Sequence, residues 1–157
     1  MEVKKIIILR GIQGSGKTTW AKQWVNEDPE NRVRFNRDDI RNMLGKYLIP
    51  TREYLINDIY KVFLEQATLR KYDIVIDNMN LNEKCIKEIK DFVRETNEWL
   101  GQSPLNLKYE IEIKDFFNVP LEECIERDSK REHPIGEPVI RNTYNKYKSV
   151  LCNGTDI

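Results

Sequence analysis

Residues 3–18 of this chain join an apolar run, VKKIIILR, to a glycine-rich turn, GIQGSGKT. A β-branched run of this kind is typical of a strand that is buried on both faces, as in parallel sheets covered by helices. A helical pattern begins directly after the turn, at residue 17. This strand, turn and helix predict an α/β fold that begins with a buried strand of a parallel sheet.

The glycine-rich turn matches the phosphate-binding pattern G-x-x-x-x-G-K-[ST] in full, between a strand and a helix as that pattern requires. Its glycines permit a backbone whose N–H groups surround phosphate oxygens, next to the positive end of the following helix. The lysine can reach the β- and γ-phosphates, and the threonine hydroxyl can bind Mg²⁺. We expect ATP phosphates, with Mg²⁺ at Thr18, to be bound by Gly14, Ser15, Gly16, Lys17, Thr18 and Thr19.

Strand and helix patterns alternate along the rest of the chain. We expect strands over 3–10, 32–36, 73–80 and 107–114, and helices over 17–26, 38–45, 51–71, 82–100, 120–131 and 138–150. No repeat or linker interrupts this order, so residues 1–157 are predicted to form a single domain. The predicted fold is a three-layer α/β sandwich of the P-loop kinase type, with a mainly parallel central sheet and a small helical lid at about residues 127–138.

The charge balance excludes a protein that is drawn to nucleic acid by a global basic field. The chain has 26 Lys and Arg against 26 Asp and Glu, so any nucleic-acid contact must be local. Its cysteines, Cys85, Cys124 and Cys152, have no metal-ligand spacing, which suits reduced thiols in a cytosol. Because no apolar run is long enough to cross a bilayer, we expect a cytoplasmic protein with no membrane partner.

Among nucleotide enzymes, the chain is most economically a kinase. It lacks the D-x-x-G switch motif of GTPases, and its NKYK lacks the acid of the guanine-binding motif. An AAA-type motor would need a far longer chain. A kinase needs the donor phosphates held, an acceptor hydroxyl placed in line, its proton accepted, and the moving charge neutralised.

Candidates for the base and the metal follow the expected strands. Asp38 or Asp39 stands after the second strand, where parallel sheets present ligands and where a carboxylate can accept a hydroxyl proton. The alternative is a capped, solvated helix start. Asp77 ends the next buried strand, where it either holds a metal-bound water or forms a turn.

Two arginines precede the Pro- and Gly-containing loop EHPIGEP. Arg127 and Arg131 are four residues apart on one helix, so they share a face and can close on the donor phosphates as a lid. The alternative is a solvated helix end, because cations are favoured near a helix C-terminus.

The chain resembles the 5′-hydroxyl polynucleotide kinases, most closely the kinase domain of phage polynucleotide kinase-phosphatases. The resemblance covers roughly residues 4–148 and is carried, in order, by GIQGSGKTTW, NRDDIR, DNMNLN and RDSKR. It implies transfer of the ATP γ-phosphoryl to the 5′-OH end of RNA or DNA, in nucleic-acid end healing and repair. It also implies a cytoplasmic location, in the host cell if the protein is phage-encoded.

The resemblance assigns roles by matching positions. It implies that Lys17 serves the donor phosphates, that Asp38 is the general base and that Arg41 contacts the 3′-phosphate of the acceptor. It makes Arg131 the lid arginine on the donor phosphates and Arg127 a second lid position. The sequence DNMNLN departs from the phage pattern. Since the chain ends at residue 157, the phosphatase and ligase of such a pathway are expected to be separate proteins.

Two alternatives stay open at this stage. Small P-loop kinases of sugars, nucleosides or antibiotics share the loop and a nearby acid. They need no arginine for an acceptor phosphate, so the presence of Arg41 favours a polynucleotide kinase over these enzymes. A non-catalytic ATP-binding module is the other alternative. Such a module needs neither a base nor a lid, so Asp38 and Arg131 argue against it.

We predict that Lys17→Ala abolishes turnover while the fold survives. The lysine is a positive charge on the moving phosphates that no neighbouring side chain replaces. The measurement is phosphoryl transfer from labelled ATP, with circular dichroism as the check on folding. Normal transfer by a folded Lys17→Ala protein would exclude a kinase.

Overall fold

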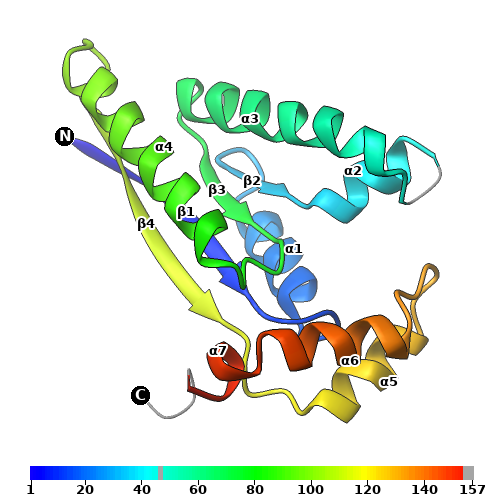
Figure 1. The fold of residues 1–157 in the computed structure, drawn as a ribbon. Helices are drawn as coiled ribbons and strands as arrows, with labels where there is room; N and C mark the ends of the chain where they lie inside the picture. Colours follow the sequence, from blue (N-terminus) through cyan, green and yellow to red (C-terminus); the bar gives the residue numbers. More distant parts are fainter. Residues whose placement is uncertain (46–47, 154–157) are drawn as a thin grey trace.

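The computed structural model describes residues 1–45 and 48–153. Strands and helices alternate through most of the chain, and the last three elements are helices (Figure 1). The elements are β1 Glu2–Arg10, α1 Lys17–Glu27, β2 Arg32–Phe35, α2 Arg37–Met43, the 3₁₀ helix η1 Pro50–Arg52, α3 Glu53–Leu69, β3 Asp73–Ile76, α4 Glu83–Gly101, β4 Leu107–Asp115, α5 Leu121–Ser129, α6 Glu137–Lys146 and α7 Lys148–Asn153.

The sheet has four strands in the order β2-β3-β1-β4, and every neighbouring pair is parallel. Strand β1 lies inside the sheet, where Ile8 is in register with Ile76 of β3 and with Ile113 of β4. Strand β4 is an edge strand whose first half alternates buried and exposed residues. The parallel sheet therefore agrees with the sequence prediction.

Helices cover both faces of the sheet, which gives three layers. On one face, Ile6 and Ile8 of β1 belong to a core that helices α3 and α4 complete. On the other face, Ile7 and Leu9 pack with Ala21 of α1. Because successive side chains of a strand point to opposite faces, the single run IIIL supplies both cores. The three-layer sandwich predicted from the sequence is confirmed.

A third apolar cluster lies beyond the ends of the strands. It joins the segments that follow β1 and β3 to helices α5, α6 and α7, and its buried members are Ile12, Leu81, Cys124, Ile140 and Leu151. Figure 1 shows these three helices at the end toward which the strand arrows point. The helices that follow β4 are therefore packed next to the carboxyl edge of the sheet.

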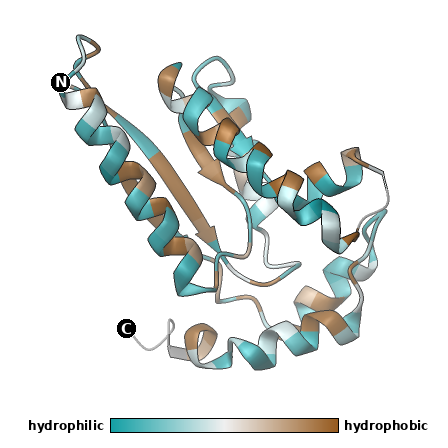
Figure 2. Cartoon of the chain, turned by 45° about the horizontal axis from the view of Figure 1, so that its top comes forward, coloured by the Kyte–Doolittle hydropathy of each residue, from teal (hydrophilic) through white to brown (hydrophobic). Residues whose placement is uncertain are grey.

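The distribution of hydropathy follows the layers. Figure 2 shows long hydrophobic stretches on strands of the sheet, whereas the helices around them carry both hydrophilic and hydrophobic residues. Helix α4, for example, buries Ile89, Val93 and Leu100 and leaves most of its other residues exposed. Within residues 1–45 and 48–153, no helix combines the length and the apolar character that a membrane span requires.

Two elements differ from the sequence prediction. The strand expected over 73–80 ends at Ile76, because Asn80 has a φ of 50° and its side-chain amide donates to the carbonyls of Leu9 and Ile76 at 2.7 and 3.3 Å. The helix expected over 138–150 is divided into α6 and α7 at Tyr147. The remaining predicted elements are present, with ends that differ by a few residues.

Candidate functional site

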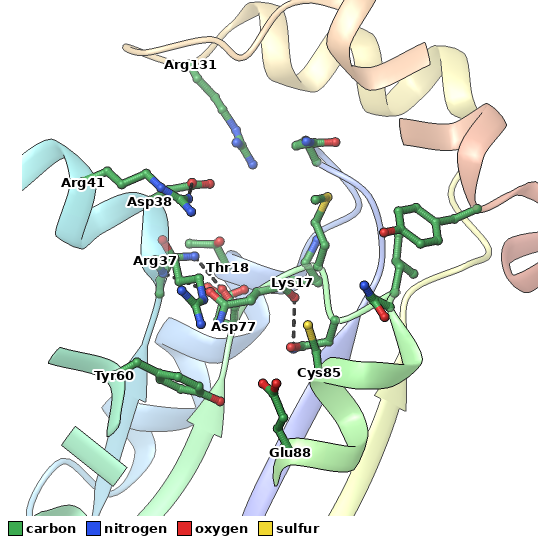
Figure 3. A pocket seen from close by; sticks show the side chains of 18 residues that line it. Lys17, Thr18, Arg37, Asp38, Arg41, Tyr60, Asp77, Cys85, Glu88 and Arg131 are labelled. Carbon is green, nitrogen blue, oxygen red and sulfur yellow. Dashed lines mark hydrogen bonds and ion pairs between the residues drawn. The ribbon is translucent and has the colours of Figure 1, made fainter. Parts of the chain in front are cut away.

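A cleft of about 340 Å³ lies at the carboxyl edge of the sheet. Parallel α/β sheets bind ligands at this edge, because the loops after several strands meet there. Figure 3 shows the side chains around the cleft, with Arg131 above Asp38 and Arg41, and Lys17 and Asp77 at its base. The lining residues are Gln13, Lys17, Thr18, Asn36, Arg37, Asp38, Arg41, Tyr60, Asp77, Asn78, Met79, Asn80, Leu81, Asn82, Cys85, Glu88, Arg131 and Tyr147.

The phosphate-binding loop, residues 11–18, is held against helix α5. Gly14 has a φ of 79°, and a Cβ atom at this position would lie 2.3 Å from the carbonyl oxygen of Cys124. Glycine is therefore required at this position both by the backbone conformation and by the close approach of α5. Arg127 donates from Nη1 to the Gly14 carbonyl at 3.4 Å, so a second contact joins the same two segments.

Lys17 is buried at the start of α1, and its ammonium group is held by the loop itself. Nζ donates to the carbonyls of Gly11 and Ile12 at 2.7 and 2.8 Å, and to Ser15 Oγ at 3.3 Å. Burial lowers the pKa of Lys17 to about 8, although the nearby Asp77 carboxylate opposes part of that fall. The group is still mostly protonated at neutral pH, and a bound phosphate would favour its charged form further.

Thr18 and Thr19 follow Lys17 but face different surroundings. Thr18 lines the cleft, whereas Thr19 is exposed on the first turn of α1. Ser15 is buried and accepts the bond from Lys17. Of the predicted donor-phosphate residues, Lys17 and Thr18 thus line the cleft, whereas Gly14, Ser15, Gly16 and Thr19 are not among its lining residues.

Asp77 is a buried carboxylate, and only one of its oxygens has a hydrogen-bond partner among the described residues. The residue is 1% exposed, and Oδ2 accepts from Nε of Arg34 at 2.8 Å. Oδ1 is buried and has no hydrogen-bond partner within the part of the chain that the structure describes. An orphaned carboxylate oxygen in the same cleft as Thr18 fits a hydrated divalent cation, since Mg²⁺ prefers oxygen ligands and keeps several waters. The side chain binds Arg34 rather than the backbone of its own turn.

The loop after β3, residues 77–82, is fixed to its neighbours by amide side chains. The Asn78 side chain accepts from the backbone N–H of Arg37 at 2.9 Å, and Asn36 Nδ2 donates to the Asp77 carbonyl at 2.5 Å. The buried Asn80 binds the end of β1, as described above. Within DNMNLN, only the aspartate was predicted from the sequence to have a role. The repeated asparagines were the sequence signal for these contacts, since an Asn side chain can both donate to and accept from backbone groups.

Asp38 and Arg41 contact each other on helix α2, as their spacing of three residues predicts. Arg41 Nη1 donates to Asp38 Oδ1 at 2.6 Å. Both residues line the cleft. Asp39, the alternative candidate for the base, pairs instead with Arg34 at 2.6 Å. The helix is capped by Asn36, whose side chain accepts from the Asp39 N–H, so the aspartates stand in the first turn and are not the cap.

Glu53, at the start of α3, was not identified from the sequence. Its two carboxylate oxygens accept from Nε and Nη2 of Arg41 at 2.9 and 3.0 Å. This hydrogen-bonded pair raises the pKa of Arg41 above its ordinary value and lowers the pKa of Glu53. A bidentate carboxylate fixes the plane of a guanidinium, so Glu53 and Asp38 together set the direction in which Arg41 faces.

The two arginines predicted to form a lid lie in different places. Arg131 points into the cleft from above (Figure 3) and is among its lining residues. Arg127 binds the phosphate loop, as noted above, and pairs with Glu123 at 2.6 Å. The structure therefore brings Arg131 together with Lys17, Asp38 and Arg41 around one cleft, whereas Arg127 contacts the phosphate loop and is not among the lining residues.

Comparison with known proteins identifies a matching family, described as an AAA domain (AAA_33), over residues 6–152. A curated protein, the L-seryl-tRNA(Sec) kinase of Methanococcus maripaludis, is 23% identical over 150 residues, which are 90% of this chain and 52% of that protein. The chain therefore spans about half the length of this curated relative. The family match runs from within β1 to within α7.

Two solved structures have similar folds. One, described as the Pnkp1/Rnl/Hen1 complex, is 29% identical with a TM-score of 0.62, and the match covers 81% of this chain and 40% of that chain. The other, described as the Pnkp1/Rnl/Hen1 RNA repair complex, is 24% identical with a TM-score of 0.69, and the match covers 95% of this chain and 45% of that chain.

We predict that Gly14→Ala lowers the free energy of unfolding by about 1–3 kcal/mol or more. The substitution places a side chain on a left-handed backbone and brings its Cβ atom into a clash with the Cys124 carbonyl. Urea denaturation gives the measurement. The matched control is Gly101→Ala at the end of α4, where an added Cβ meets no atom within 4 Å. The control should leave stability unchanged or raise it by up to about 1 kcal/mol. Equal stability of the two variants would contradict the packing of α5 on the loop.

Proposed function

The chain belongs to the AAA domain family, within which it is a P-loop kinase domain, and from this premise we propose that it is an ATP-dependent polynucleotide 5′-hydroxyl kinase. Its acceptor is the 5′-OH end of RNA or DNA. The observation that carries the proposal is the pair formed by Asp38 and Arg41, a carboxylate and a guanidinium in contact at 2.6 Å across the cleft from Lys17. A base for a hydroxyl and a cation for a phosphate are what such an end requires.

One group of residues binds the phosphates of the donor, ATP. Backbone N–H groups of the phosphate loop, together with Lys17, bind the β- and γ-phosphates of ATP. Arg131 meets the γ-phosphoryl group from above. Mg²⁺, held by Thr18 and through a water by Asp77, would neutralise charge on the donor phosphates.

The transfer step requires one base and one positioning cation. The 5′ oxygen bonds to the γ-phosphorus, the bond from that phosphorus to the β–γ bridging oxygen breaks, and ADP leaves. The hydroxyl proton passes to Asp38. An ordinary carboxylate is sufficient because a loose transition state asks the base mainly to orient the hydroxyl until late proton transfer.

The acceptor is held by its 3′-phosphate on Arg41. Glu53 fixes two of the N–H groups of this guanidinium and so presets the orientation in which Arg41 meets the phosphate. The similarity to chains of the Pnkp1/Rnl/Hen1 complex, which one of the two structures describes as an RNA repair complex, supports a nucleic-acid acceptor. We propose that a phosphatase and a ligase outside residues 1–157 complete the healing of such ends in the cytoplasm.

The test is a panel of acceptors, each incubated with labelled ATP and Mg²⁺. The panel contains 5′-OH RNA and DNA oligonucleotides, a nucleoside 3′-monophosphate, a bare nucleoside, several sugars and L-seryl-tRNA, which the curated relative suggests as a second candidate acceptor. We expect label on the oligonucleotides and on the 3′-monophosphate. Transfer confined to the seryl group or to a sugar would assign the other class of kinase.

Arg41→Ala is expected to weaken acceptor recognition by about 1.5–3 kcal/mol, the range for a charge-assisted hydrogen bond. The loss should appear with a nucleoside 3′-monophosphate and be small with a bare nucleoside, which has no phosphate to lose. Steady-state kcat/KM for the two acceptors gives the comparison. Equal impairment of both would mean that Arg41 only supports the fold.

Asp38→Asn is expected to lower kcat by about 10²–10⁴-fold, because the amide keeps the shape of the side chain and cannot accept the proton. The KM for the acceptor should change little. Asp39→Asn is the matched control, since Asp39 pairs with Arg34 and is not among the residues that line the cleft. If Asp39→Asn reduced kcat as much as Asp38→Asn, the assignment of the base would fail.

A further inference from the structure

Asp128 is a buried carboxylate at the end of α5 that none of the steps above uses. The residue is 1% exposed, within the RDSKR segment that also contains both arginines discussed above. A buried carboxylate is costly unless it is paired and hydrogen-bonded, so its partners indicate what it is for.

Among the described residues, the recorded partners of the Asp128 side chain lie in the loop between α5 and α6. Oδ1 accepts from the backbone N–H of Ile135 at 3.1 Å, and Oδ2 accepts from the N–H of Gly136 at 2.9 Å. Nη1 of Arg131 lies 3.7 Å from Oδ1. The Asp128 side chain therefore joins the last turn of α5 to the residue before α6, and so links the two ends of the loop 130–136.

Arg131 lies at the beginning of this loop, and Asp128 contacts it in two places. Its backbone N–H donates to the carbonyl of Asp128 at 3.0 Å, and its guanidinium pairs with the carboxylate. The side chain is 40% exposed, so packing alone does not fix it. The contacts to Asp128 limit the directions in which the guanidinium can extend over the cleft.

The helices that flank the loop are anchored independently of Asp128. Cys124 of α5 and Ile140 of α6 are fully buried in the apolar cluster beyond the sheet, and α5 also touches Gly14. Loss of the Asp128 carboxylate would leave these contacts in place. Its effect is therefore confined to the two loop amides and to Arg131.

We propose that Asp128 is a positioning residue for phosphoryl transfer, which acts through Arg131 by holding the loop 130–136 over the donor phosphates. The inference rests on the proposed kinase function, but not on the identity of the acceptor. A guanidinium that is already aimed at the γ-phosphoryl group requires no reorganisation during the reaction, which is how fixed charges contribute most to catalysis.

The test is a double-mutant cycle with Asp128→Asn and Arg131→Ala. Asp128→Asn alone is expected to lower kcat by about 10²-fold, the loss that a misplacement of about 1 Å can cause. In the Arg131→Ala background the same substitution should change kcat by less than about twofold, within ordinary additivity error. An equal loss in both backgrounds would overturn the proposal, as would an unchanged kcat in the single variant.

The control substitution is Glu126→Gln on the same helix. Glu126 is exposed. In the described part of the chain, the only recorded partner of its side chain is Lys130, at 3.1 Å. Removal of the Glu126 charge should therefore leave kcat unchanged. If Asp128→Asn does not fold, Asp128→Glu serves in its place. The longer carboxylate keeps the charge but shifts the loop, and its loss of kcat should likewise disappear in the Arg131→Ala background.

Hydrogen exchange gives a readout that does not depend on activity. In Asp128→Asn the amides of Ile135 and Gly136 should exchange faster, while those of α1 keep their wild-type rates. Unchanged exchange at both loop amides would overturn the proposal. A wild-type protein that transfers no phosphate to a 5′-OH acceptor would instead refute the proposed acceptor, and the exchange result would still decide the role of Asp128.

Discussion

The burial of β1 on both faces is the constraint on which the rest of this structure depends. Its side chains supply apolar contacts to the helices above and below the sheet, and its two neighbours run parallel to it. Parallel strands end at one edge, so the phosphate loop after β1 meets the segments after β2 and β3 there. The position of Lys17, Asp38 and Asp77 around one cleft follows from this arrangement.

Charge in the cleft is organised by pairing. Arg34 binds both Asp39 and Asp77, while Arg41 binds Asp38 and Glu53. Such pairs hold the orientation of the acids and arginines in a partly buried site, where an unpaired charge would be costly. A chain with no net charge thus gathers a local cluster of paired charges at this edge of the sheet, and the segment NRDDIR supplies several of its members.

Most of the fold could be predicted from the sequence, because apolar periodicity depends on local spacing. The run IIIL identified β1 as a buried strand, and the last strand was predicted over 107–114, close to the observed β4. The division of the last predicted helix at Tyr147 was missed, since apolar periodicity does not register a local change in backbone direction. The early end of β3 was missed because it depends on Asn80 reaching the carbonyl of Leu9, a residue 71 positions away.

The sequence by itself determined those parts of the site whose geometry is local. The phosphate loop is one continuous segment, and the contact between Asp38 and Arg41 follows from their spacing on one helix. Only the tertiary structure decided which distant charges meet: Glu53 with Arg41, Arg34 with Asp77, and Asp128 with the amides of its loop. The reason is physical. With 26 basic and 26 acidic residues, many pairings are chemically equivalent, and the packing of helices on the sheet selects among them.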